Sequence, residues 1–153
     1  MNTVALRPNL SRAFQDTDIR LSLKVLLVES DREVRRLLAF VLRFDGHQVV
    51  EAADSDEMLQ DLASSVVDRD RHHFDLIVCE HSLPTIPGLT VLAALRSRGR
   101  LTPFILMTDN TAVQFSARRL GAVIIEQPIS IKAIRSAVRQ TQAAAQTDAI
   151  VLP

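Results

Sequence analysis

The chain has 153 residues, of which 47% are hydrophobic and 24% charged, and its formal net charge is zero. This length and composition predict one globular domain with its own core, and the zero net charge gives no overall field to attract nucleic acid or an anionic membrane. No apolar run approaches the roughly 18 residues that a membrane-spanning helix needs. The lone Cys79 excludes an internal disulfide and is typical of a reducing compartment, so we expect a cytoplasmic protein.

The sequence divides into three segments. Residues 1–22 are polar and irregular and predict a flexible N-terminal arm, with at most a short helix over residues 10–14. Residues 23–142 follow a regular pattern and predict the domain itself. Residues 143–153 are first alanine-rich and then weakly apolar, and they predict a C-terminal tail.

Strands and helices alternate through the predicted domain. Short apolar runs predict five strands, over residues 25–28, 47–52, 76–80, 103–108 and 122–125. A helix is predicted after each strand, and the third and fourth helices cover residues 89–98 and 112–120. This order predicts an α/β fold, a doubly wound parallel sheet in a single domain, whose sites lie at the carboxyl ends of the strands.

Capping signals and apolar spacing define the other helices. Ser30 with Glu33, and Asp54 with Glu57, form capping boxes, and Ser130 caps the last helix. The apolar residues expected to share the core face of these helices are Val34, Leu37, Leu38, Val41 and Leu42 in the first, Met58, Leu59, Leu62 and Val66 in the second, and Ile131, Ile134 and Val138 in the last.

Five short motifs follow one another at the predicted strand ends and in the adjoining loops. They are Glu29-Ser30-Asp31, Glu80 with Pro84 and Gly88 in its loop, Thr108, Gly121-Ala122, and Gln127-Pro128. In this order the motifs resemble those of response-regulator receiver domains, over about residues 24–140. The resemblance implies a flavodoxin-like sheet with strand order 2-1-3-4-5 and a signalling module that is not an enzyme.

The receiver family uses an aspartate that accepts a phosphoryl group, two further acids that hold Mg²⁺, a lysine and a switch hydroxyl. By resemblance, Glu80 stands at the acceptor position, Gln127 at the lysine position and Thr108 at the switch hydroxyl. Glutamate is one methylene longer than aspartate, which moves its oxygens by roughly 1.5 Å. Three alternatives follow for Glu80: it is inert, it mimics the phosphorylated state, or it accepts a phosphoryl group.

The predicted metal site is weak or absent. Glu29, Asp31 and Glu80 are the candidate ligands, but the second acidic position is Ser30, whose hydroxyl is a poor Mg²⁺ ligand. Asp109 is expected to add a fourth carboxylate to the pocket. Without the family lysine, this crowding raises pKa values or recruits a cation. We therefore expect no cofactor beyond weakly bound Mg²⁺.

Other basic and imidazole groups give weaker signals. Lys132 lies a turn into the last predicted helix, from which its amine reaches back toward the pocket or remains on the surface. His72 and His73, beside Asp68 and Asp70, match no standard metal-ligand spacing and predict a solvated loop. His81 follows Glu80 at the rim of the pocket.

These observations favour a degenerate receiver, or pseudoreceiver, that binds other proteins without aspartyl phosphorylation. The alternative is a Mg²⁺-dependent phosphoacceptor that uses Glu80, and a third hypothesis treats the two terminal arms as tethers to an output protein. The expected partners are a histidine kinase, a phosphotransfer protein or an output protein, but not nucleic acid. By resemblance, the fourth helix, fifth strand and fifth helix form the docking or homodimer surface, for which we select Phe115, Arg118, Arg119, Arg135 and Arg139.

Overall fold

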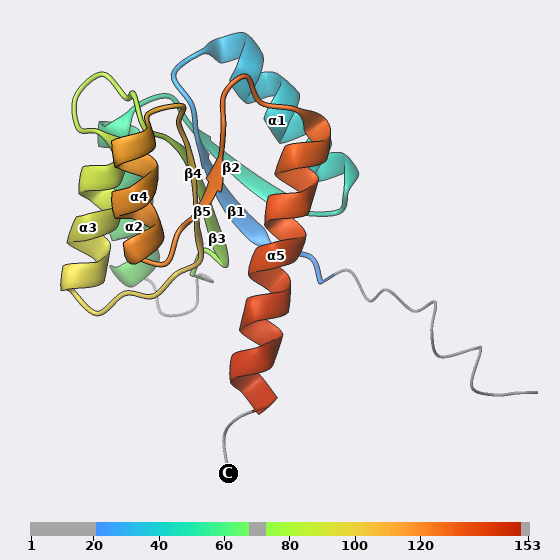
Figure 1. Ribbon diagram of the computed structural model, residues 1–153. Helices are drawn as coiled ribbons and strands as arrows, with labels where there is room; N and C mark the ends of the chain where they lie inside the picture. The colour runs from blue at the N-terminus through green and yellow to red at the C-terminus, as the bar shows by residue number, and fades with distance from the viewer. Residues whose placement is uncertain (1–20, 68–72, 151–153) are drawn as a thin grey trace, which may run out of the picture.

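The computed structural model describes residues 21–67 and 73–150 (Figure 1). Residues 1–20 of the predicted arm, the connector residues Asp68, Asp70 and His72, and the side chain of Val66 lie outside this part of the chain. The described residues form the predicted α/β fold, a parallel sheet between two layers of helices.

Five strands form the sheet in the order β2-β1-β3-β4-β5, as predicted. Their bounds are β1 Lys24–Val28, β2 Gln48–Ala52, β3 Leu76–Glu80, β4 Phe104–Met107 and β5 Val123–Ile125. β1 and β3 are adjacent at the centre, in a register that pairs Val28 with Cys79. The carboxyl ends of β1 and β3 are therefore neighbours.

Helices cover both faces of the sheet. They are α1 Arg32–Phe44, α2 Ser55–Val67, α3 Gly88–Ser97, α4 Thr111–Arg119 and α5 Ile131–Ile150. α1 and α5 cover one face, and α2, α3 and α4 cover the other (Figure 1). α5 extends beyond residue 142, where the sequence predicted a tail.

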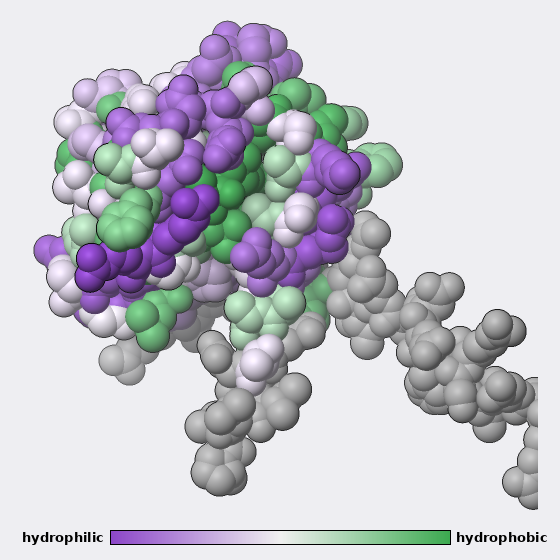
Figure 2. Space-filling view, viewed as in Figure 1, coloured by the Kyte–Doolittle hydropathy of each residue, from purple (hydrophilic) through white to green (hydrophobic). Residues whose placement is uncertain are grey.

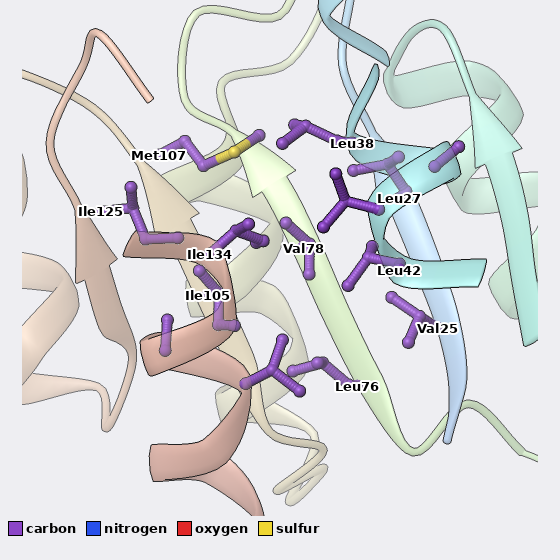
Figure 3. Close-up of a cluster of buried hydrophobic side chains, with 14 residues drawn as sticks. Val25, Leu27, Leu38, Leu42, Leu76, Val78, Ile105, Met107, Ile125 and Ile134 are labelled. Carbon is purple, nitrogen blue, oxygen red and sulfur yellow. The ribbon is translucent and has the colours of Figure 1, made fainter. Parts of the chain in front are cut away.

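Each strand contributes alternate residues to two hydrophobic cores. Leu27, Val78 and Ile105 point toward α1 and α5, where Figure 3 shows them meeting Leu42 and Ile134. The intervening strand residues pack against α2, α3 and α4. Because successive side chains in a strand point to opposite faces, near-continuous apolar runs are what a sheet covered on both sides requires.

The cap of α1 differs from the prediction. Asp31 is the N-cap, and its Oδ1 accepts hydrogen bonds from the amides of Glu33 and Val34 at 2.8 and 3.0 Å. A carboxylate also complements the positive end of the helix dipole, which a serine hydroxyl does not. Ser30 is therefore not the cap, and its hydroxyl bonds elsewhere.

The other two predicted caps are present. The amide of Glu57 donates to Asp54 Oδ1 at 2.8 Å, and the amide of Ala133 donates to Ser130 Oγ at 3.0 Å. Both helices therefore begin where the sequence signals placed them.

Three residues predicted for the core are exposed instead. Leu37 of α1 is 51% exposed, Leu59 of α2 is 41% exposed and Ile131 of α5 is 43% exposed. Each lies at the edge of an apolar helical stripe, where periodicity alone does not separate buried from exposed positions. Among the helices of the described residues, none is long and apolar enough to cross a membrane.

The loop after β3 is held close to the sheet at Gly88. A Cβ atom added there would lie 2.5 Å from the backbone oxygen of Glu80, which is closer than real contacts allow. A glycine is therefore required where α3 begins against the end of β3.

Candidate functional site

Three acidic residues meet at the carboxyl ends of the two central strands. Glu29 follows β1 directly, Glu80 is the last residue of β3, and the pairing of Val28 with Cys79 brings them side by side. Asp31 follows in the same loop as Glu29 and contributes to its electrostatic environment. The structure thus brings together the acids that the sequence placed in one pocket, with the exception of Asp109.

Glu80 is held by Ser30. Its Oε2 atom accepts a hydrogen bond from the Ser30 hydroxyl at 2.6 Å and another from the Ser30 amide at 3.0 Å. Bonds to a charged acceptor are shorter and stronger than bonds between neutral groups. The longer side chain of glutamate therefore spans the space between β3 and the β1–α1 loop.

Glu29 is almost fully buried beside this contact. It is 2% exposed, and its Oε1 accepts a hydrogen bond from the Asp31 amide at 2.9 Å. Burial raises the pKa of Glu29 from 4.5 to about 7, and the neighbouring charge of Glu80 acts in the same direction, against the Asp31 amide. A hydrogen bond between the Glu29 and Glu80 carboxyls requires one proton between them.

Two features of these carboxylates bear on metal binding. The Oδ1 atom of Asp31 already accepts two amide hydrogen bonds of α1, and Glu29 retains a proton up to about neutral pH. A carboxyl must lose its proton to serve as a ligand. Within residues 21–67 and 73–150, no group of three His, Cys, Asp or Glu side chains has the arrangement needed to hold a metal ion.

Thr108 lies at the end of β4 but bonds away from Glu80. It is buried, and its Oγ1 accepts a hydrogen bond from the Asn110 amide at 3.2 Å. The buried Gln114 side chain donates to the Thr108 carbonyl at 3.1 Å. Both bonds connect Thr108 to the beginning of α4.

The remaining predicted pocket residues lie at its edge or outside it. Asp109 is exposed and is not among the groups that raise the pKa of Glu29, so the predicted crowding by four acids is wrong for this residue. Gln127 is half-buried, and no hydrogen bond in the described part of the chain connects it to Glu80. Lys132 is exposed on α5, and the His81 ring accepts a long hydrogen bond, 3.5 Å, from the amide of Leu89 at the start of α3.

Arg35 is a neighbour of the pocket that the sequence interpretation missed. Its Nη1 donates to the Glu29 carbonyl at 2.7 Å, and its Nε lies 3.8 Å from Glu51 of β2. Arg35 stands four residues after the cap Asp31, on the side of α1 that faces β2.

Three of the five residues selected for the docking surface lie on α4. Phe115, Arg118 and Arg119 are all exposed, and the Arg119 guanidinium lies 5.9 Å from the centroid of the Phe115 ring. Figure 2 shows polar residues over α4 and α5, with a hydrophobic strip between them. This strip coincides with the edge strand β5 in Figure 1.

α5 contributes one of its two selected arginines to this surface. Arg139 is exposed, whereas Arg135 donates to both carboxylate oxygens of Asp45, at 2.7 and 2.9 Å. Asp45 caps the end of α1, so Arg135 lies on the α1 side of α5. Arg135 is therefore not part of the surface formed by α4, β5 and α5.

Known proteins share both the sequence pattern and the fold. Residues 25–139 match the response regulator receiver domain. The response regulator protein FleR of Pseudomonas aeruginosa is 32% identical over 114 residues, which cover 72% of this chain and 23% of FleR. The response regulator MprA of Mycobacterium ulcerans is 36% identical over 102 residues, which cover 67% of this chain and 41% of MprA. The chain thus spans less than half the length of these relatives.

Solved structures with lower identity share the fold. A response regulator receiver domain protein from Clostridium thermocellum has a TM-score of 0.71 at 18% identity, over 83% of this chain and 98% of that one. The chemotaxis protein CheY4 of Vibrio cholerae has a TM-score of 0.65 at 23% identity, over 79% and 99%. With its sheet order, its motifs and the match over residues 25–139, this chain belongs to the response regulator receiver domain family.

Proposed function

We propose that this receiver domain acts as a protein-interaction module that is not switched by phosphorylation at the acceptor position. Receiver domains belong to two-component signalling, are not enzymes, and interact with histidine kinases and output partners. The observation that carries the proposal is the pair of hydrogen bonds from Ser30 to Glu80 Oε2. These bonds engage one oxygen of the carboxylate that phosphoryl transfer would need.

The charges in the pocket are also unfavourable for a transferred phosphoryl group. A transferred phosphoryl group brings negative charge to a site that already contains Glu29, Asp31 and Glu80. Gln127 brings no positive charge at the family's lysine position, so the charge-assisted contact to the phosphoryl oxygens is lost. Nucleophilic attack also depends on placement, and a shift of about 1 Å in the nucleophile slows a reaction by about a hundredfold.

Of the alternatives for Glu80, the inert one has more support than the mimic. A mimic of the phosphorylated state would engage the switch hydroxyl of Thr108, but no hydrogen bond joins Thr108 to Glu80 in the described part of the chain, and Thr108 Oγ1 accepts one from the Asn110 amide. Glu80 bonds instead to Ser30, on the other side of the pocket. We therefore assign Glu80 a structural role that fixes the β1–α1 loop.

The partner surface in this proposal is the face of α4, β5 and α5. Phe115, Arg118, Arg119 and Arg139 are exposed there, and an aromatic ring with arginines is a composition enriched in binding hot spots. A histidine kinase, a phosphotransfer protein, an output protein or a second copy of the chain is the expected partner. A cytoplasmic location belongs to the same proposal.

Incubation with a small acyl phosphate donor, with and without Mg²⁺, tests the proposal by intact-protein mass spectrometry. We expect no covalent phosphoryl group on the wild type under either condition. Glu126→Gln, which changes an exposed glutamate after β5, is the matched control for Glu80→Gln. A Mg²⁺-dependent label that Glu80→Gln abolishes and Glu126→Gln retains would replace the proposal with the alternative, a phosphoacceptor that uses Glu80.

A further inference from the structure

The outer face of α1 carries an exposed apolar surface that the proposed function does not use. Leu37, Phe40 and Phe44 are 51%, 66% and 75% exposed, and the Phe40 and Phe44 rings stack with centroids 6.2 Å apart. Their spacing of three and four residues places them in one row along the helix. Exposed aromatic residues gathered in this way mark a surface that another group covers.

A hollow accompanies this row. An open cavity of about 450 Å³ is lined by Phe40 and Phe44 together with Arg36, Arg43 and Glu51. Arg43 forms an ion pair with Glu51 at 3.0 Å, whereas Arg36 has no ion-pair partner among the described residues. The surface is thus apolar at its centre, and at its rim Arg36 carries a positive charge that no acidic group among the described residues pairs with. We call these five residues and Leu37 the α1 face.

The N-terminal arm joins the described structure beside the α1 face. The Ser22 hydroxyl donates to the carbonyl of Gly46 at 2.8 Å, two residues beyond Phe44, and the Leu23 amide donates to His47 Nδ1 at 3.2 Å. From α5, the Gln142 side chain donates to the carbonyl of Leu21 at 3.1 Å. The arm is therefore anchored at the same end of α1 as the most exposed ring.

We propose that residues 10–19 of this chain cover the α1 face, with the side chain of Phe14 in the hollow. This segment contains the apolar Leu10, Phe14 and Ile19, and its acidic residues Asp16 and Asp18 complement Arg36. The cover is an intramolecular one that a protein partner of α1 must displace. The inference concerns α1 and stands independently of the proposed function of the pocket.

The length of the arm suits this placement. The eight residues from Phe14 to Ser22 span at most about 28 Å when extended and about 12 Å as a helix. The row from Phe44 back to Leu37 is about 10 Å long, at 1.5 Å per helical residue. Phe14 therefore reaches the row in either conformation. A segment tethered this closely has an effective concentration in the millimolar range, which favours contact within one chain over contact between copies.

Disulfide trapping in the full chain tests the proposal. The experimental variant is Phe14→Cys/Phe40→Cys, and the control is Phe14→Cys/Phe115→Cys, since Phe115 on α4 has nearly the same exposure as Phe40, 64% against 66%, on the opposite face of the sheet. Cys79 does not compete, because it is fully buried and its thiol pKa is raised by that burial. Under mild oxidation we expect the intramolecular disulfide of the experimental variant to form roughly tenfold faster than that of the control. Equal rates would overturn the proposal, as would a disulfide that forms mainly between two copies.

A second measurement does not depend on cysteine chemistry. In NMR spectra of the full chain, Phe14→Ser is expected to shift the aromatic resonances of Phe40 and Phe44, and Phe14→Leu is expected to leave them close to the wild type. Resonances that do not respond to Phe14→Ser would show that the arm does not lie on the α1 face.

Discussion

The sheet core and the carboxylate pocket adjoin on β3, where Cys79 is fully buried and the next residue, Glu80, is half-buried. In the core every strand follows the receiver pattern, with apolar residues alternating toward two helical layers. In the pocket the acceptor, the second acid and the lysine all differ from the family chemistry, at Glu80, Ser30 and Gln127. Burial of apolar surface stabilises the fold whatever the pocket contains. The receiver fold is therefore compatible with different residues at these three pocket positions.

Restoring the family residues gives the sharpest contrast between the two regions. If the core alone maintains the shape of the pocket, a triple variant is expected to become a Mg²⁺-dependent phosphoacceptor. This variant carries Ser30→Asp, Glu80→Asp and Gln127→Lys. Mass spectrometry after incubation with an acyl phosphate donor is expected to change from no label to a label on most molecules. The matched triple variant carries Glu80→Asn in place of Glu80→Asp and remains unlabelled. A folded restored variant that takes up no label would show that the pocket geometry has also been lost.

Truncation of one core residue is expected to cost more stability than any change in the pocket. Ile134 of α5 is fully buried among β-strand and α1 residues, and Ile134→Ala costs about 3 kcal/mol through lost burial and the cavity left behind. Ile131, one turn earlier on the same helix, is 43% exposed, so Ile131→Ala costs less than about 1 kcal/mol. Urea denaturation measures the free energy of unfolding of both variants, and equal losses of stability would contradict the assignment of Ile134 to the core.

The pocket is expected to make stability depend on pH. Because the folded-state pKa of Glu29 is about 7 and its ordinary value is 4.5, the folded protein binds the proton more tightly than the unfolded chain does. The stabilisation from protonated Glu29 is complete below about pH 4.5 and is lost as the pH rises to about 7. The free energy of unfolding is expected to fall by an amount on the order of 1–3 kcal/mol over this range. Denaturation in urea across this range measures it, and Glu29→Gln is expected to remove this dependence.

The smallest effect concerns the hydroxyl that holds Glu80. Ser30→Ala removes the 2.6 Å hydrogen bond and keeps the amide bond at 3.0 Å. Since Ser30 is exposed, we expect Ser30→Ala to lower the free energy of unfolding by only about 0.5–1 kcal/mol. Ser30→Thr keeps a hydroxyl and serves as the control. If the two variants have the same free energy of unfolding, the hydrogen bond from the Ser30 hydroxyl to Glu80 does not stabilise the fold.

The sequence predicts the fold far better than it predicts the site. Strand runs such as Leu76–Glu80 are apolar throughout because both faces are covered, and this pattern is local. The bond between Ser30 and Glu80 joins residues fifty positions apart, so it has no local signature. The cap of α1 was ambiguous because Ser30 and Asp31 are adjacent and both are good caps, and only the structure shows that Asp31 fills this role.

Surface assignments show the same limit. Leu37 fits the apolar stripe of α1 by spacing, but it is 51% exposed and forms an exposed row with Phe40 and Phe44. Arg135 was expected on a docking surface, yet an acidic partner at Asp45, ninety positions away, holds it against α1. Periodicity identifies a helix, but the neighbouring elements decide which of its side chains are covered.

The most direct test of the central claim is an NMR titration of the glutamate side-chain carboxyl carbons from roughly pH 4 to pH 9, with and without millimolar Mg²⁺. The account predicts that the Glu29 carboxyl titrates near pH 7 and that Mg²⁺ leaves this midpoint unchanged, because a buried, protonated carboxyl must lose its proton before it can bind a cation. A midpoint near the ordinary value of 4.5, or one that Mg²⁺ lowers by about one unit or more, would contradict it.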